Sequence, residues 1–147
     1  MSQQRVKHAR AYFRRDGKQV IVVTVHQGPN GAFVEADGPL SLTRWDDEAL
    51  GEGLQTALGH SAQTSKVASG TPGAATLKAS GEPSPRAFDA GFIALSLLAG
   101  DPDGSILVQG RPEPGLTLSG RIPPLAAAPE FARQATRIFQ ICRDRKF

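Results

Sequence analysis

Side chains that could carry out acid–base, nucleophilic or metal chemistry are few and widely separated in this sequence. The histidines are His8, His26 and His60, and the only thiol is that of Cys142. No pair of histidines has the short spacing typical of a metal site, and one cysteine allows neither an internal disulfide nor a cysteine-based zinc site. No glycine-rich phosphate-binding motif is present either. We therefore predict no catalytic residues, no cofactor and no metal, with the histidines on the surface or at strand edges.

An enzyme whose groups converge only in three dimensions stays as an alternative. A hollow that holds His26 or His60 near a carboxylate would favour it, because a general base must lie within reach of the proton that it removes. Cys142 belongs to an apolar stripe at helical spacing, and we expect it to be buried and unreactive, since a free cysteine packs as a small apolar residue.

The acidic run Asp46, Asp47 and Glu48 directly follows the only tryptophan, Trp45. Carboxylates stabilise the positive end of a helix, so this run predicts a helix start with Asp46 as its cap. We expect Trp45 to pack the entry of that helix against the core. Alternatively, Trp45 is an exposed anchor of a protein interface, where acidic neighbours would suit a basic partner. Trp45, Asp46, Asp47 and Glu48 are therefore the interface residues that we predict.

Positive charge is concentrated at the two ends of the chain. The net charge of +3 is made up of +5 in the first twenty residues, +2 in the last five and −4 in between. Tyr12 and Phe13 lie between Arg10 and Arg14, and aromatic residues interleaved with arginines can stack on nucleic acid. Because Phe13 alternates with small apolar residues, we expect it in the core and interpret the charges as a solvated surface. A nucleic-acid-binding protein that uses this basic N-terminal strand is the alternative function.

The composition indicates one domain, residues 1–147. A chain of 147 residues with 39% apolar residues can bury a modest core. Its longest apolar runs span four residues, whereas a bilayer requires roughly 20, so a transmembrane protein is excluded. No charged-then-apolar leader opens the chain, and we expect a soluble, cytoplasmic protein.

Alternating and β-branched stretches in the first half predict an antiparallel sheet followed by a helix. Asp16-Gly17 between two such stretches is a hairpin signal. The run Val20 to His26 is apolar almost throughout and suits a strand buried on both faces. The predicted strands span 9–14, 20–26, 32–36 and 40–42, and the predicted helix has Leu50, Leu54, Ala57 and Leu58 on one face and ends at Gly59.

The second half repeats this order after a stretch, 61–85, in which small, polar and turn-forming residues dominate. We predict a mobile linker there, with one or two helical turns at 74–80. The predicted elements that follow are strands at 91–98, 105–109 and 115–119 and a helix from Pro129 with Phe131, Ala135, Ile138 and Cys142 on one face.

Overlaying the halves, 9–60 and 86–143, aligns two pairs of triplets. These are Arg10-Ala11-Tyr12 with Arg86-Ala87-Phe88, and Leu40-Ser41-Leu42 with Leu116-Thr117-Leu118. The predicted fold class is therefore α/β of the α+β type: an antiparallel sheet with two principal helices and a pseudo-twofold repeat of a strand-strand-strand-helix unit. Chance agreement between two β-rich stretches is the alternative.

The first sixty residues also resemble a family of small bacterial proteins. The similarity is carried by residues 11–18 (AYFRRDGK), Val22-Val23-Thr24, residues 47–54 (DEALGEGL) and Ala57-Leu58, and more faintly by Leu77-Lys78-Ala79-Ser80-Gly81, Ser84, Arg86, Phe88, Gly91 and the closing helix. These features resemble the immunity proteins of contact-dependent growth inhibition systems. The resemblance covers most of residues 9–142.

The resemblance implies a cytoplasmic protein, without catalytic activity or cofactor, that binds and blocks the toxic C-terminal domain of a large secreted effector. Such toxins are frequently nucleases. Inhibition requires a preformed surface over the toxin's active site or substrate path, and tight cognate pairs use aromatic and charged anchors. Immunity proteins against basic nucleases are often acidic, so the net charge of +3 implies an interface on the acidic body of the chain or a toxin that is not basic.

Overall fold

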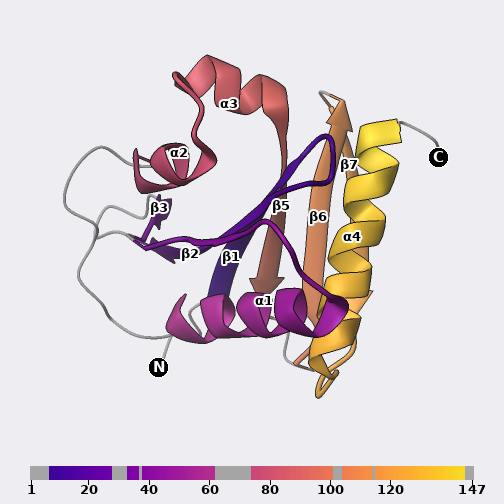
Figure 1. Cartoon of the computed structure of the whole chain (residues 1–147). Coiled ribbons are helices and arrows are strands. Elements are labelled where there is room, and N and C mark those ends of the chain that lie inside the picture. The colour runs from indigo at the N-terminus through magenta and orange to yellow at the C-terminus, as the bar shows by residue number, and fades with distance from the viewer. Residues whose placement is uncertain are drawn as a thin grey trace.

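The computed structural model describes residues 7–27, 33–36, 38–61, 74–100, 104–113 and 115–144. The elements, in chain order, are β1(Lys7–Arg14), β2(Val20–Gln27), β3(Phe33–Glu35), β4(Leu40–Leu42), α1(Asp47–Ser61), α2(Ala74–Ser80), α3(Pro85–Gly91), β5(Phe92–Ala99), β6(Ile106–Glu113), β7(Leu116–Ile122) and α4(Ala128–Asp144). Figure 1 shows one sheet with helices on both sides. No helix within the described ranges is long and apolar enough to cross a membrane.

The sheet is antiparallel throughout, and the first strands of the two halves of the chain, β1 and β5, lie side by side at its centre. Its order is β3-β2-β1-β5-β6-β7, and β4 pairs with β2 on the same edge as β3, at Val20 to Val22. The central pair β1–β5 runs from Lys7 opposite Ala99 to Arg14 opposite Phe92. Each half of the chain builds outward from this seam and closes with a helix, α1 or α4. The predicted α+β class with an antiparallel sheet is therefore confirmed, and the order of elements agrees with the predicted repeat.

One face of the sheet forms the core with α1 and α4. Phe13 is 1% exposed and stacks on Phe139 of α4, with ring centroids 4.7 Å apart. Cys142 is buried on the same helix stripe, as predicted, and burial raises the pKa of its thiol. The predicted stripes of both helices are confirmed; their buried side chains are Leu50, Leu54, Ala57, Leu58, Phe131, Ala135, Ile138 and Cys142.

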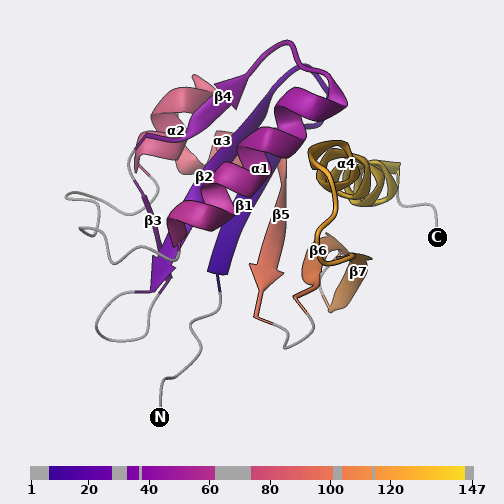
Figure 2. The same ribbon diagram turned by 90° about the horizontal axis from the view of Figure 1, so that it is seen from below.

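The two long helices meet at a glycine. A Cβ at Gly51 would lie 1.7 Å from the carbonyl oxygen of Ala128, the first residue of α4. Backbone cannot move aside as a flexible side chain can, so only glycine allows α1 to pass α4 at this distance. Figure 2, seen from below, shows α1 lying along β1 and β2 with α4 beside it.

The predicted start of α1 at the acidic run is confirmed, but its predicted end at Gly59 is wrong. The Asp46 side chain accepts a hydrogen bond from the backbone N–H of Ala49 at 2.8 Å, the geometry of an N-cap. The helix continues past Gly59 to Ser61, whose hydroxyl donates to the carbonyl of Val25 and accepts the N–H of His8. These contacts with β1 and β2 outweigh the weak helix preference of Gly59.

Within the predicted linker at 61–85, the structure describes residues 74–85 and Ser61 at the end of α1. Ala74–Ser80 forms α2, in agreement with the predicted helical turns. Ser84 then caps a further helix, α3, by accepting the N–H of Ala87 at 3.1 Å, with Pro85 at the first helical position. Residues 62–73 lie outside the described part of the chain, as do the predicted turns at 28–31 and 101–103.

Helix α3 also corrects the overlay of the two halves. Arg86-Ala87-Phe88 is helical, whereas the triplet aligned with it, Arg10-Ala11-Tyr12, belongs to β1. The strand that corresponds to β1 is β5, which begins at Phe92. The polar start Ser84-Pro85 sets this boundary, because proline fixes the φ angle that the first helical turn needs.

Strands β6 and β7 are longer than predicted. Strand β6 continues past Gln109 to Glu113, although it contains Pro112. The pairing of β6 with β7 shifts its register between Gly110 and Glu113, and a proline, which cannot donate to a ladder, is tolerated at such an irregularity. Gly110 faces α4, where a Cβ would lie 2.9 Å from the sulfur of Cys142.

Candidate functional site

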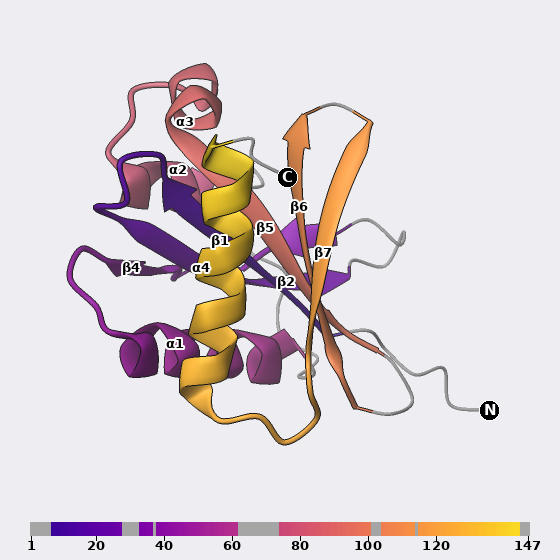
Figure 3. The ribbon, with the colours of Figure 1, turned by 90° about the vertical axis from the view of Figure 1, so that its right-hand side faces the viewer.

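The face of the sheet opposite α1 and α4, here called the far face, has two unlike halves. Helices α2 and α3 contact its β1–β2–β3 part, the closed half. In its β5–β6–β7 part, the open half, α3 contacts the start of β5, where Phe88 packs against Phe92. In Figure 3, α2 and α3 gather beside the β1–β2 hairpin, whereas β6 and β7 stand on the other side of α4. Because strand side chains alternate, the open half presents Phe92, Ala94, Ser96, Leu98, Leu107, Gln109, Arg111, Thr117, Ser119 and Arg121.

A buried carboxylate ties the closed half together. Glu35 of β3 is 7% exposed. Its Oε2 accepts hydrogen bonds from the Arg10 guanidinium at 3.0 Å and from the Tyr12 hydroxyl, and its Oε1 accepts the Thr76 hydroxyl at 2.7 Å. Burial, together with the bond to Glu35, raises the pKa of Tyr12. The network joins β1, β3 and α2, and it neutralises the buried charge.

Arg14, at the end of β1, holds the end of α2. Its guanidinium donates to the Glu82 carboxylate at 2.8 Å, to the carbonyl of Ser80 at 2.9 Å and to the side chain of Gln19. It also lies over the ring of Phe92, 4.5 Å from the centroid. The Arg14 guanidinium therefore links the end of β1 to the β1–β2 turn, to the end of α2 and to the residues that follow α2.

The short helix α3 contacts the closed half through one aromatic side chain. Phe88 packs against Tyr12, with ring centroids 5.0 Å apart, and against Phe92, with centroids 4.8 Å apart. None of the residues of α3 is fully buried. This aromatic cluster is accordingly its main apolar anchor on the sheet.

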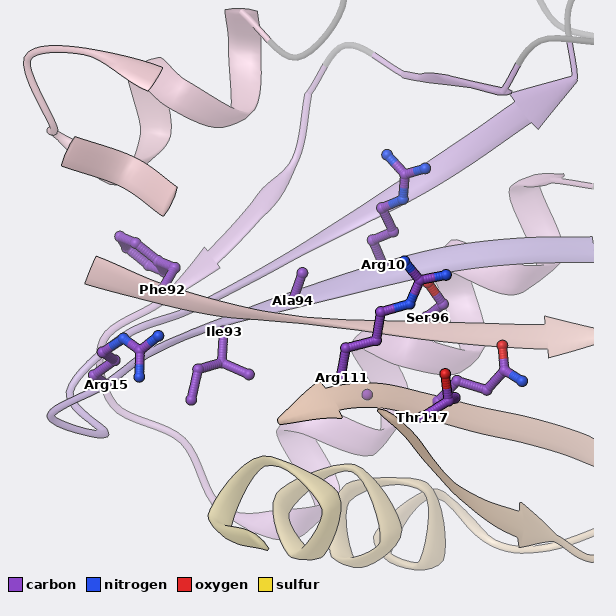
Figure 4. A pocket seen from close by; sticks show the side chains of 10 residues that line it. Arg10, Arg15, Phe92, Ile93, Ala94, Ser96, Arg111 and Thr117 are labelled. Atoms are coloured by element: carbon purple, nitrogen blue, oxygen red, sulfur yellow. The ribbon is translucent and has the colours of Figure 1, made fainter. Parts of the chain in front are cut away.

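A hollow of about 540 Å³ lies over the open half and extends to β1 of the closed half. The floor and rim consist of strand residues from β1, β5, β6 and β7 and the first residue of the β1–β2 turn: Arg10, Arg15, Phe92, Ile93, Ala94, Ser96, Gln109, Gly110, Arg111 and Thr117. Figure 4 shows the Arg10 and Arg111 side chains extending to the same side of the strands, around Ser96. The lining includes three arginines and no acidic residue.

The three arginines of the hollow differ in what holds them. Arg10 is paired with Glu35, and its side chain is 30% exposed. Arg15 is exposed and donates from Nε to the carbonyl of Ala90 at 2.9 Å. Arg111 is exposed and has no acidic partner among the described residues. The hollow thus offers fixed and unneutralised guanidinium groups together with the hydroxyls of Ser96 and Thr117 and the amide of Gln109.

The histidines do not form a site in the described structure. His8 and His26 are 5% and 9% exposed, so the prediction that they lie on the surface or at strand edges is wrong for both. They belong to β1 and β2, which are inner strands covered on both faces. Burial, and secondarily the charge of Arg10, lowers the pKa of His8 to about 4. Burial and then the charge of His60 lower the pKa of His26. His60 is exposed as predicted, and neither His26 nor His60 lines the hollow.

The predicted interface residues lie at the start of α1, on the helical side of the sheet. Trp45 is partly buried against the core, which agrees with the expectation that it packs the helix entry. Asp46, Asp47 and Glu48 are exposed. Asp47 lies 3.9 Å from Arg133 of α4, in an exposed pair that contributes little to stability. Their role in an interface stays a prediction.

Arg10 and Tyr12 belong to the basic strand that the sequence indicates, whereas Arg111 and Glu35 are not evident from the sequence, for identifiable reasons. Arg111 was left outside any element because the predicted strand stopped at Gln109. Glu35 was placed in a strand, but its partners Tyr12 and Thr76 come from distant parts of the chain. The one sequence signal that could have indicated Glu35 is its charge, which lies in an otherwise apolar strand that follows a strand buried on both faces.

Comparisons with known proteins show the fold. No protein-family model matches this sequence, and no curated protein sequence is significantly similar to it. Among solved structures, the chain is similar to a protein of unknown function from Neisseria meningitidis, with 14% identity and a TM-score of 0.69 over 97% of this chain and 98% of the other. It is also similar to a chain of the CdiA-CT/CdiI toxin and immunity complex from Yersinia pseudotuberculosis, with 10% identity and a TM-score of 0.64 over 94% and 97%.

Proposed function

We propose that this protein is an immunity protein, which binds and neutralises the C-terminal toxin domain of a cognate contact-dependent growth inhibition effector. The observation that carries the proposal is the fold shared, over nearly the whole of both chains, with a chain of a toxin and immunity complex. The resemblance of residues 11–18 and 47–54 to such immunity proteins supports it independently of the fold. A protein in this role would act in the cytoplasm.

The proposed activity is binding and not catalysis. The hollow on the far face is lined by guanidinium, hydroxyl and amide groups, which recognise a partner through hydrogen bonds. Its lining includes neither a carboxylate nor a histidine that would serve as a general base. The sheet and its two packed helices supply the rigid surface that tight inhibition needs.

The test is protection and complex formation. The C-terminal domain of the effector encoded immediately upstream is expressed with and without this chain, cell survival is followed, and co-purification of the two proteins is measured. We expect rescue together with a stable complex. Growth arrest in the presence of this chain, or the absence of a complex, would contradict the proposal.

The predicted contribution of Trp45 is tested in the same complex. Trp45→Ala is expected to weaken toxin binding while the far-ultraviolet circular dichroism and the cooperative unfolding of the chain are retained. Loss of folding in this variant would instead assign Trp45 to the core alone, in line with its partial burial there.

Nucleic-acid binding is the second candidate, and the hollow gives it a specific basis. Arg10 and Arg15 of the N-terminal hairpin meet Arg111 there, which adds a distant arginine to the basic strand. Salt dependence separates the two candidates. Phosphate contacts release counterions and weaken steeply with salt, whereas a shape-matched protein interface weakens less.

A further inference from the structure

We propose that the open half of the far face is the docking surface for a carboxylate-bearing segment of the partner protein, with Arg111 as its principal anchor. The inference rests on the proposed function, since it assumes a protein partner. It adds the location of the surface and the chemistry of the segment that occupies it.

Charge is the first argument. The hollow gathers Arg10, Arg15 and Arg111, and its lining includes no acidic side chain. Only Arg10 is neutralised, by Glu35 on its closed-half side. A carboxylate that binds a guanidinium group neutralises its charge and can form bidentate hydrogen bonds with it. The surface is therefore complementary to Asp or Glu side chains.

Preorganisation is the second argument. Arg10 is oriented by its bond to buried Glu35 at 3.0 Å, and Arg15 is held by its own backbone and side-chain bonds to Gly91 and Ala90. At the centre of the floor, Ser96 and Gln109 belong to strands that are paired on both sides, which fixes their backbone. Binding thus costs little ordering of this chain, which favours affinity.

The character of the floor favours a protein segment over nucleic acid. Single-stranded nucleic acid is held by exposed aromatic rings on which bases stack. The one aromatic residue of the lining, Phe92, is 4% exposed, and Arg14 and Phe88 occupy its faces. Three guanidinium groups, one of them already paired, are also few for a phosphate backbone, whose affinity depends on many such contacts. Arginine is, in contrast, enriched among the dominant residues of protein interfaces.

The first experiment measures the affinity of the cognate toxin domain for matched charge-reversal variants. Arg111→Glu is expected to weaken binding by about 30-fold or more, which is the effect of losing a dominant interface residue. Arg137→Glu makes the same change of charge at an exposed position of α4, on the other side of the sheet, and is expected to change the affinity less than about 3-fold. Both variants should unfold at temperatures within about 2 °C of wild type.

The second experiment uses two probes that need no toxin. The amide resonances of the full chain are followed while hexaglutamate or hexauridylate, two anionic oligomers of the same length, is added. Hexaglutamate is expected to shift amides around Ser96, Gln109 and Thr117, and Arg111→Glu is expected to abolish those shifts. Hexauridylate is expected to shift them less at equal concentration.

The outcomes separate the failure of this inference from the failure of the proposed function. A toxin that binds wild type and Arg111→Glu equally would overturn the docking surface and leave the immunity role intact. Absence of any toxin complex, with hexaglutamate still binding at the open half, would overturn the immunity role alone. Stronger binding of hexauridylate, or hexaglutamate shifts confined to α1 and α4, would overturn the docking proposal.

Discussion

The two halves of the far face are built on the same sheet and differ in what happens to their charges. In the closed half, Arg10 and Arg14 are paired with Glu35 and Glu82, and helices α2 and α3 cover the strands. In the open half, Arg111 extends from a floor of short polar side chains. The difference shows that burial forces a charge to be matched within the chain, whereas an uncovered surface can keep a charge for a partner.

The largest effect on stability is expected in the closed half, at Glu35. Glu35→Ala removes the common acceptor of Arg10, Tyr12 and Thr76 and leaves polar groups without a partner in a covered position. We expect the free energy of unfolding, measured by urea titration, to fall by about 3 kcal/mol. Glu52→Ala, at an exposed position of α1, is the matched control, with an expected change below about 0.5 kcal/mol. Equal effects of the two variants would contradict the assigned role of Glu35.

The second effect is a pH dependence that originates at His8, on the same face. Because burial lowers its pKa to about 4 from an unfolded value of 6.5, the unfolded chain binds a proton at His8 more readily than the folded chain does. The free energy of unfolding therefore carries no penalty from His8 above pH 6.5, and it decreases as the pH falls toward 4. We expect the free energy of unfolding, measured by urea titration, to decrease between pH 7 and 4.5 in both proteins. The decrease should be smaller in His8→Leu than in wild type, by on the order of 2 kcal/mol.

The control for this pH dependence is Gln140→Leu, at an exposed position of α4. Its stability should follow the wild-type curve over the same pH range, since the substitution removes no titratable group. An unchanged slope in His8→Leu would show that protonation of His8 is not linked to unfolding.

A smaller and more local effect is expected at Phe88. Phe88→Ala removes the contacts of α3 with Tyr12 and Phe92. We expect a loss of about 1.5 kcal/mol, together with faster hydrogen exchange of the α3 amides, because this helix has no fully buried residue to hold it. Leu125→Ala, at a fully exposed leucine, serves as the apolar control. Protection of α3 that persists in Phe88→Ala would contradict the anchoring role.

The smallest effect on stability is expected in the open half, at Arg111. Arg111→Ala should change the free energy of unfolding by less than about 0.5 kcal/mol in the isolated protein, since the side chain is exposed. A loss above about 1 kcal/mol in urea titration would show that Arg111 serves the fold of its own chain, and the contrast between the two halves would disappear.

The parts of the fold that periodicity controls could be predicted from the sequence. The strand 20–26, buried on both faces, and the stripes of α1 and α4 follow directly from the spacing of apolar residues. Helix α3 was missed because its sequence has no apolar stripe; only the Ser84-Pro85 start indicated it. Strand β6 was ended too early, since Pro112 stops a regular strand but not one with a register shift.

The candidate site was less accessible to prediction because it is created by pairing between strands. Arg10 and Arg111 share a hollow only because β5 joins β1 to β6. Likewise, Glu35 meets Tyr12 and Thr76 across long stretches of chain. No spacing rule along one chain encodes such contacts. The acidic run at Asp46 was easier to notice because its residues are adjacent, and the structure gives Asp46 a capping role.

The central β1–β5 pair also has a consequence for how the protein is made. On the ribosome, β1 is made shortly before β2 and can pair with it early, but its other edge must wait for Phe92–Ala99. During that interval the edge of β1 is an open template for strands of other nascent chains. Pairing that depends on such distant residues also forms slowly. Synthesis of the stretch between β1 and the end of β5 is therefore the step at which premature termination or slow translation would favour aggregation.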